Sequence, residues 1–317
     1  MASFVPTRLL IVGATGAIGR YITEAILAAK PPFTHVAIFT SPNTVTNKAD
    51  LLQTWKARGL ASVVVGSVQN EDDVQRAYTT EKPDTVISCL GRDALQVQES
   101  LLRLADAPGS PVKWVFPSEY GTDVEHNPSS ATEKPHQHKL ALRKYIREQI
   151  KNVQVTYLVT GPYFDMWVNY TPDTEPTGGF DPAAKRAVVV GDGEGRVGFC
   201  TMPDVGKFLV ASLRHPEASF GKALKVQSFV VTPNQVLAEY ERQTNAKWTV
   251  TSTPLPLLKE LEAKAWAAKS PKATSFTLRR IWAEGGTLYD KNDNEVIGIK
   301  PGDADSLETA VRRALGK

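Results

Sequence analysis

The chain has 317 residues, of which 42% are hydrophobic and 22% are charged, and its formal net charge is +3. These values are ordinary for a globular protein with a sizeable core, and so small a basic excess excludes a strongly basic nucleic-acid or membrane-surface binder. We therefore expect neither nucleic acid nor a membrane among the partners. No apolar run approaches the roughly 18 residues of a membrane helix, and the N-terminus lacks a secretory signal pattern.

The first half of the chain alternates short β-branched runs with helical patterns, which is typical of a parallel sheet with crossover helices. The expected strands are Leu9–Val12, His35–Phe39, Ser62–Val65, Thr85–Ser88, Val112–Phe116 and Val155–Val159. The expected helices are Ala17–Ala29, Lys48–Arg58, Asp72–Tyr78, Leu95–Ala107 and Lys134–Ile150. Right-handed crossovers then predict an α/β fold of the Rossmann type, a doubly wound parallel sheet with ligands at the carboxyl ends of its strands.

The pattern changes after about Pro162. Residues 169–186 are rich in Pro, Gly and Thr and predict a long loop, residues 187–199 predict a strand, a turn and a strand, and residues 201–216 predict a helix. Further helices are expected at Val236–Thr244, Leu257–Lys269 and Ser306–Leu315. We predict a Rossmann domain over 1–162, to which 196–228 returns, and a smaller, discontinuous substrate-binding region over 163–195 and 229–317.

Three glycines, Gly13, Gly16 and Gly19, lie between the first strand and the first helix. The first allows a tight turn, the second lets the backbone approach a pyrophosphate, and the third lets the helix pack closely on the strand. A glycine triplet can also be a purely structural turn, but its position on strand, turn and helix favours a dinucleotide site. The expected binding loop comprises Gly13, Ala14, Thr15, Gly16, Ala17, Ile18 and Gly19.

The end of the second strand distinguishes the two nicotinamide cofactors. An NAD site places a carboxylate there to bind the ribose hydroxyl, whereas this chain has Thr40, Ser41 and Asn43. Hydroxyl and amide groups can bind a 2′-phosphate without repelling it, and Lys48 could add a positive charge. The alternative for Lys48 is an exposed lysine at a helix start. The pattern favours NADP(H).

Two cysteines, Cys89 and Cys200, are far apart in apolar sequence. This spacing predicts buried thiols rather than a disulfide framework. A reducing compartment suits such thiols, so we expect a cytoplasmic protein.

Several motifs occur together in one order: VGATGAIG (12–19), VISCLG (86–91), VKWVFPSEYGTD (112–123), Lys139 with Arg143 one helical turn later, VVVGDGEGRVGF (188–199) and TMPDVG (201–206). Together they resemble the NmrA-like, isoflavone-reductase-like branch of the atypical short-chain dehydrogenases. That branch includes isoflavone, pinoresinol–lariciresinol and phenylcoumaran benzylic ether reductases. The likeness extends over most of the chain and weakens toward the C-terminus.

The resemblance implies NADPH-dependent reduction of small aromatic, secondary-metabolite-like molecules. It assigns the 2′-phosphate to Lys48, the catalytic proton transfer to Lys139, and a cofactor or substrate contact to Arg143. Many relatives have an arginine where this chain has Thr40, which is a departure from the pattern. The motifs that follow the fourth and fifth strands add three expected cofactor contacts, Leu90, Gly91 and Ser118.

Lys139 is the candidate proton carrier. The Tyr-x-x-x-Lys pair of ordinary short-chain dehydrogenases is missing after the fifth strand, and Tyr78 with Lys82, which have this spacing, precede the fourth. A lysine can transfer protons where burial or a neighbouring cation lowers its pKa. Arg143 lies four positions later, on the same helical face. We predict that Lys139 moves the proton that accompanies hydride from nicotinamide C4; the alternative is a solvated lysine.

His136 and His138 raise the question of a metal site. On a helix, residues two apart diverge by about 200°, so this spacing disfavours a shared ion. We expect no metal, and we place His138 at the rim of the active site.

Aromatic residues follow the sixth strand, where a substrate should bind. They would form an apolar wall suited to a flat ring, although a hydrophobic contact between the two regions is the alternative. The expected substrate contacts are Tyr120, His138, Phe164, Met166, Trp167 and Tyr170, and Trp266 and Trp282 could close the pocket from the C-terminal side.

Three functions remain open from the sequence. The first is an NADPH-dependent reductase of a small aromatic substrate. The second is an NmrA-type regulator that senses NADP(H) and acts through protein partners, and the third is a non-redox isomerase or eliminating enzyme. Some regulators lack the lysine, so Lys139 with Arg143 favours the reductase. A homodimer is also open.

Overall fold

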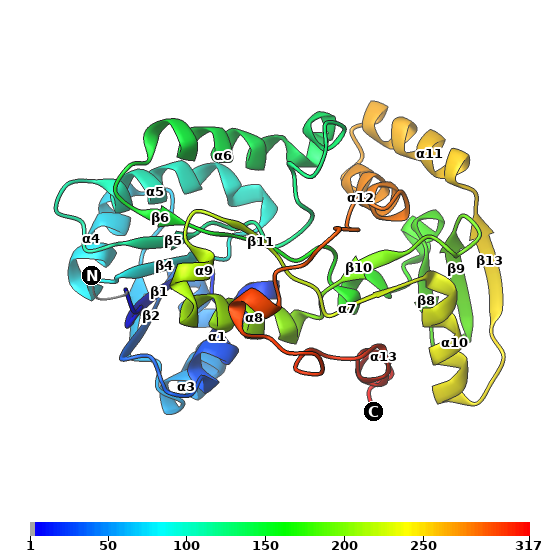
Figure 1. Cartoon of the computed structure of the whole chain (residues 1–317), viewed down its shortest axis with the longest axis horizontal. Helices are drawn as coiled ribbons and strands as arrows, with labels where there is room; N and C mark the ends of the chain where they lie inside the picture. Colours follow the sequence, from blue (N-terminus) through cyan, green and yellow to red (C-terminus); the bar gives the residue numbers. More distant parts are fainter. Residues whose placement is uncertain (1–3) are drawn as a thin grey trace.

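A computed structural model describes residues 4–317 and contains a six-stranded parallel sheet with helices on both faces (Figure 1). The strands are β1 (Arg8–Val12), β2 (His35–Thr40), β3 (Ser62–Val65), β4 (Thr85–Ser88), β5 (Trp114–Phe116) and β6 (Gln154–Val155). Their spatial order is β3-β2-β1-β4-β5-β6. This order is that of a doubly wound dinucleotide-binding sheet, so the predicted fold class is confirmed.

Helices cover the two faces of this sheet. They are α1 (Ala17–Ala28), α2 (Pro42–Asn47), α3 (Ala49–Ala57), α4 (Glu71–Glu81), α5 (Gln98–Asp106) and α6 (Gln137–Gln149), with 3-10 turns at Arg92–Val97, Ser130–Thr132 and Lys134–His136. Alternate residues of β1 enter different cores: Leu9 and Ile11 pack with α1, and Leu10 and Val12 with α4 and α5. Each such burial stabilises the fold by about 1.5–3 kcal/mol.

Two details of this half differ from the sequence prediction. A helix already begins at Pro42, because Ser41 caps it by accepting a hydrogen bond from the Thr44 N–H at 3.2 Å. The sixth strand is divided at Thr156. Its first part, β6, pairs with β5, and its second part, β7 (Tyr157–Val159), pairs with β11 (Ala223–Lys225).

Helix α8 (Met202–Arg214), with the short α9 (Pro216–Ser219), returns to the sheet and packs against α1. Gly206 is the contact point, since a Cβ there would lie 2.6 Å from the Tyr21 carbonyl oxygen. Phe208 and Leu209 are fully buried in the same core as Ile22. A late segment of the chain therefore completes one face of the Rossmann sheet.

The remaining segments form a second region beside the sheet (Figure 1). In it, β8 (Gly179–Asp181), β9 (Arg186–Val190) and β13 (Thr249–Thr253) form one sheet, and β10 (Val197–Phe199) pairs with β12 (Phe229–Val231). Its helices are α7 (Phe164–Trp167), α10 (Pro233–Thr244), α11 (Leu255–Ala267), α12 (Ala273–Ala283) and α13 (Leu307–Ala314), with a 3-10 turn at Pro172–Thr177. The 3-10 turn at Glu295–Ile297 packs instead against α8 and α9, and Ile297 is buried in the core of the first sheet.

Three features of this region were not predicted. The two strands expected within 187–199 belong to different sheets, because β9 pairs with β8 and β13 while β10 pairs with β12. The expected long loop at 169–186 contains a 3-10 turn and strand β8. Helix α12 had no counterpart in the sequence analysis, and it lines the cavity described below.

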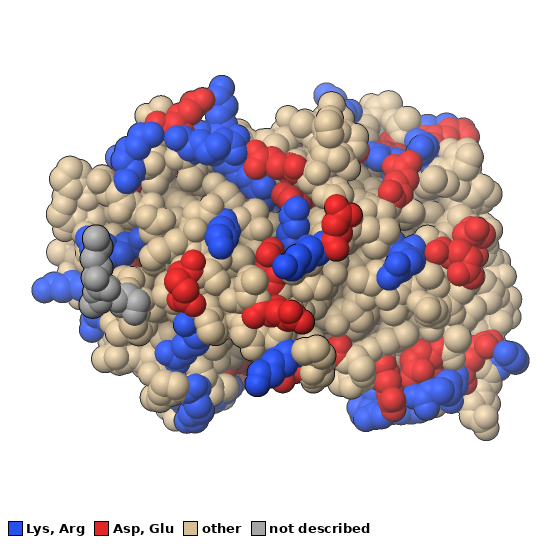
Figure 2. Space-filling view, viewed as in Figure 1, with Lys and Arg blue, Asp and Glu red and all other residues tan. Residues whose placement is uncertain are grey.

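The surface carries both signs of charge, and Figure 2 shows basic and acidic side chains interspersed over one face. Among residues 4–317, no helix combines the length and the apolar character needed to cross a bilayer. Cys89 and Cys200 are both free thiols and both buried.

Candidate active site

The glycine loop has the geometry that a dinucleotide requires. Gly13 has φ +79°, and a Cβ there would lie 2.6 Å from the Cys89 carbonyl oxygen. A Cβ on Gly19 would lie 2.2 Å from the Gly13 carbonyl oxygen, so only glycine lets α1 start this close to the loop. Gly16 is the N-cap of α1, and no side chain caps the first turn. Free N–H groups at this helix end fit the phosphates of a dinucleotide.

We predict that Gly19→Ala lowers the free energy of unfolding by about 1–3 kcal/mol, because the added methyl must displace backbone atoms. Gly91→Ala is the matched control, since a Cβ there has no atom within 4 Å and the chain has room for it. Chemical unfolding of both variants measures the difference. Equal stability of the two variants would contradict the close approach of α1 to the loop.

The other expected cofactor residues lie at the carboxyl ends of neighbouring strands. Thr40 ends β2, Ser41 and Asn43 begin the next helix, and Lys48 lies exposed between α2 and α3. Leu90 and Gly91 follow β4, and the Ser118 hydroxyl donates to the Leu90 carbonyl oxygen at 2.8 Å. Because β2, β1 and β4 are adjacent in the sheet, these residues lie along the edge that carries the glycine loop.

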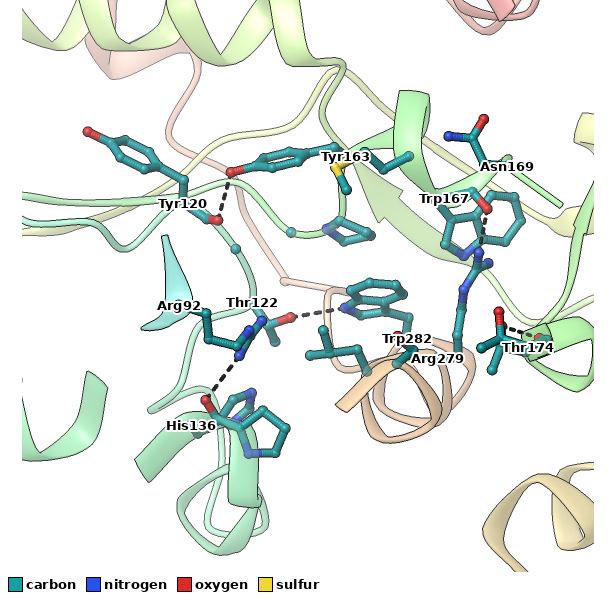
Figure 3. Close-up of a pocket in the computed structure, with 18 of the residues that line it drawn as sticks. Arg92, Tyr120, Thr122, His136, Tyr163, Trp167, Asn169, Thr174, Arg279 and Trp282 are labelled. Atoms are coloured by element: carbon teal, nitrogen blue, oxygen red, sulfur yellow. Dashed lines mark hydrogen bonds between the residues drawn. The ribbon is translucent and has the colours of Figure 1, made fainter. Parts of the chain in front are cut away.

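A cavity of about 460 Å³ opens beside this edge, between residues that follow β4, β5 and β7 and residues of α12 (Figure 3). Its apolar and aromatic walls include Tyr120, Pro162, Tyr163, Met166, Trp167, Leu278 and Trp282. Its basic lining residues are Arg92, His136, Lys139 and Arg279, and within residues 4–317 no Asp or Glu lines it. A cavity of this size and lining suits a flat, small organic molecule.

Lys139 lies in the first turn of α6, and its side chain is 15% exposed. Its ammonium donates a hydrogen bond to the Glu119 carbonyl oxygen and lies 4.0 Å from the Glu119 carboxylate. Burial lowers the pKa of Lys139 to about 8, Glu119 opposes this change, and the cations of Arg92 and Arg143 add to it. An amine with this pKa can accept and release a proton near neutral pH.

The structure does not bring Arg143 to the cavity. Its guanidinium is 1% exposed and binds the carboxylates of Glu119, Asp123 and Glu125 at 3.0–3.1 Å. It also lies 4.5 Å from the ring centre of Tyr157. Arg143 therefore lies on the same face of α6 as Lys139, as predicted. Its guanidinium, however, is bound by acids from the segment after β5 and does not reach the cavity. In this structure Arg143 positions Glu119, which in turn accepts the hydrogen bond from Lys139.

The two histidines of the His-x-His motif point to different environments. His138, the expected rim residue, is exposed and does not line the cavity, whereas His136 is buried and does. His136 Nδ1 lies 2.9 Å from the Ser130 carbonyl oxygen and must donate to it, which leaves Nε2 as an acceptor without a partner in the described chain. Burial lowers the pKa of His136, so its ring is neutral at pH 7. No cluster of three or more potential metal ligands occurs among residues 4–317.

Three of the expected substrate contacts, Tyr120, Met166 and Trp167, line the cavity. Phe164 does not, because it is fully buried against Phe199 and Phe229 in the core of the second region. Tyr170 does not line it either. The Tyr170 hydroxyl donates to Glu175 at 3.0 Å, and Arg186 stacks on its ring.

Sequence reasoning missed the lining residues Arg92, Tyr163 and Arg279, whereas it named Trp282 as a residue that could close the pocket. Tyr163 donates to the Tyr120 carbonyl oxygen at 2.9 Å and lies along the cavity wall. Trp282, but not Trp266, closes the cavity from the C-terminal side, and its indole N–H donates to Thr122 at 3.0 Å. The alternative pair, Tyr78 and Lys82, does not line the cavity.

Comparison with known proteins places these features in a family. The sequence profile of the NmrA-like family matches residues 6–273. Isoflavone reductase of Pisum sativum is 27% identical over 249 residues, which cover 74% of this chain and 75% of that protein. A phenylcoumaran benzylic ether reductase of Ginkgo biloba is 29% identical over 243 residues, which cover 75% of each.

Solved structures show the same fold. Leucoanthocyanidin reductase of Vitis vinifera, solved as a complex with NADPH, superposes with a TM-score of 0.79 at 19% identity, over 98% of this chain and 100% of that one. AtPrR2, solved with NADP+ and (+)pinoresinol, gives a TM-score of 0.78 at 20% identity, over 98% and 100% of the two chains. The glycine loop, the sheet order and the matched profile agree: the chain belongs to the NmrA-like family.

Proposed function

We propose that this protein is an NADPH-dependent reductase of a small aromatic, secondary-metabolite-like substrate. The observation that carries the proposal is the Lys139 ammonium, which has a lowered pKa and lines an aromatic cavity at the edge of a sheet that carries a dinucleotide loop. The similarity to isoflavone and phenylcoumaran benzylic ether reductases supports the same reaction class.

When bound, the cofactor supplies hydride from its nicotinamide C4. Reduction then requires one proton for each hydride, and Lys139 is the group in the cavity that can hold and transfer it at neutral pH. Glu119 keeps the ammonium in place through its carbonyl oxygen. His136 lines the same cavity, and its Nε2 is buried and accepts no hydrogen bond within residues 4–317. The walls formed by Trp167 and Trp282 would exclude water and orient a flat ring.

The cofactor expected is NADP(H) rather than NAD(H). No carboxylate follows β2, and the exposed ammonium of Lys48 lies on the segment that would face the ribose. We expect Lys48→Ala to weaken NADPH binding by a factor of about five to ten and to leave NADH binding unchanged, because only NADPH carries the 2′-phosphate. Calorimetric titration of both cofactors measures this. Lys56→Ala, an exposed lysine on α3, is the control, and an equal loss for NADH would contradict the assignment.

A screen of phenolic and enone compounds, followed by NADPH absorbance, tests the reaction class. Substrate-dependent oxidation of NADPH supports the reductase. Tight NADP(H) binding without turnover, together with a specific protein partner, would support a sensing role instead. Conversion of a substrate without consumption of NADPH would support an isomerase.

Three further expectations belong to this proposal. We propose that residues 1–162 and 196–228 bind the cofactor, and that 163–195 and 229–317 bind the substrate. A cytoplasmic location is supported by the two buried free thiols. A homodimer would be tested by light scattering.

A further inference from the structure

Arg279 lies on α12, at the end of the cavity away from His136 (Figure 3). Its guanidinium carbon lies 4.9 Å from the ring centre of Trp167 and 6.0 Å from that of Trp282. Its hydrogen bond in the described chain goes to the Trp167 carbonyl oxygen. Because a guanidinium carries five N–H donors, most of the donors of Arg279 are left for a ligand.

No carboxylate within residues 4–317 forms an ion pair with Arg279. The next residue, Arg280, shows the contrast, since it binds Glu133, Glu262 and Glu284. Burial alone lowers the pKa of Arg279, and no acidic neighbour offsets it. A partly buried cation without a counter-ion costs free energy, and an anionic ligand would recover it.

The rest of the cavity lining also favours the binding of an anionic ligand. Its charged lining residues are all basic, so nothing in the described lining repels a negative group. Trp282 lies between Arg279 on one side and Arg92 with His136 on the other (Figure 3). A flat ring lying along this indole would reach toward both ends. Arg279 and Trp282 also lie beyond residue 273, where the match to the family profile ends.

We propose that the substrate is an aromatic carboxylate whose carboxyl group binds Arg279 while its reducible end faces Lys139. A guanidinium matches a carboxylate through two parallel hydrogen bonds, and the flanking indoles would shield this pair from water. This inference rests on the proposed function, because it names the substrate class of the same cavity.

The test compares two probes that differ only in charge, 4-hydroxycinnamate and 4-hydroxycinnamamide. Calorimetric titration of the full chain saturated with NADP+ measures their affinities. We expect the acid to bind about tenfold tighter than the amide, as a charge-assisted pair requires. Arg279→Gln should remove this preference by weakening only the acid, and Arg279→Lys should keep part of it. Ser275→Ala, which changes an uncharged lining residue on the same helix, should keep the full ratio.

Equal binding of acid and amide to the wild-type chain, or binding of neither, would overturn the inference. A preference that persists in Arg279→Gln would overturn it too, and a loss of NADP+ affinity in that variant would assign Arg279 to the cofactor instead. Thermal unfolding of each variant separates these results from a damaged fold. The proposed function fails separately: a preference for the acid without any NADPH turnover would reject the reductase and keep the anion site.

Discussion

Lys139→Ala lowers the kcat of NADPH-dependent reduction by about 10²- to 10⁴-fold, the usual contribution of a positioned acid or base. The loss is expected because the other groups of the cavity are poorly suited to replace it. Arg92 and Arg279 do not deprotonate. The Nδ1 hydrogen of His136 is donated to Ser130 and its Nε2 is buried, and the Tyr163 hydroxyl donates to the Tyr120 carbonyl oxygen. NADPH affinity should change little, since the glycine loop is independent of α6. Steady-state kinetics and cofactor titration measure the two quantities.

The pH dependence gives a second test of Lys139. With the pKa lowered to about 8, the wild-type rate should change near pH 8, and this inflection should be missing in Lys139→Ala. A fall of the rate above pH 8 would indicate a proton donor, and a rise would indicate an acceptor. The unfolded chain, with the ordinary lysine pKa of 10.5, binds more protons between these values. The titration of Lys139 therefore increases the free energy of unfolding as the pH rises from about 8 to 10.5. A variant that retains wild-type turnover would refute the assignment.

Arg143→Leu destabilises the fold by about 3–5 kcal/mol, because it leaves the fully buried carboxylate of Glu119 without its hydrogen-bonded guanidinium and with only the Lys139 ammonium 4.0 Å away. Asp123 loses the same cation, although Lys225 still lies 3.5 Å from it. The free energy of unfolding in urea measures the loss. We also expect reduced turnover in the folded fraction, since Glu119 would no longer be fixed beneath Lys139.

Arg147→Leu is the matched control for this variant. Arg147 lies one turn later on α6, is 57% exposed and pairs only with Glu125 among the described residues. An exposed ion pair contributes less than about 1 kcal/mol, so this change should be nearly neutral. Similar losses of unfolding free energy in both variants would show that the buried cluster contributes no more to stability than an exposed ion pair.

The sheet was predictable because its strands are buried on both faces. A run such as Leu9–Val12 is apolar throughout, and this pattern is typical of a strand that is covered on both faces. The glycine loop was predictable because its geometry depends only on residues that are close in sequence, from Gly13 to Gly19. Helix α2 was missed although Ser41 and Pro42 carry a cap signal, because the short segment lacks an apolar stripe.

The side-chain environments at the site could not be predicted, because they depend on contacts distant in sequence. Helical spacing correctly placed Lys139 and Arg143 on the same face of the helix. It could not show that three acids between residues 119 and 125 bind the arginine. The 3-10 turn before α6 buries His136 in the cavity lining, whereas His138, the expected rim residue, is exposed on α6 and does not line the cavity. Arg279 enters the cavity from a helix that is distant in sequence from every other basic lining residue.

The packing of α8 on α1 has a consequence for synthesis on the ribosome. The face of α1 that contacts Gly206, which includes Tyr21 and Ala25, stays uncovered until α8 has been translated. A nascent chain of about 160 residues would contain every strand of the first sheet and would still expose this face of α1 to chaperones. We expect ribosome-bound chains to become protease-resistant only after β11 has left the exit tunnel.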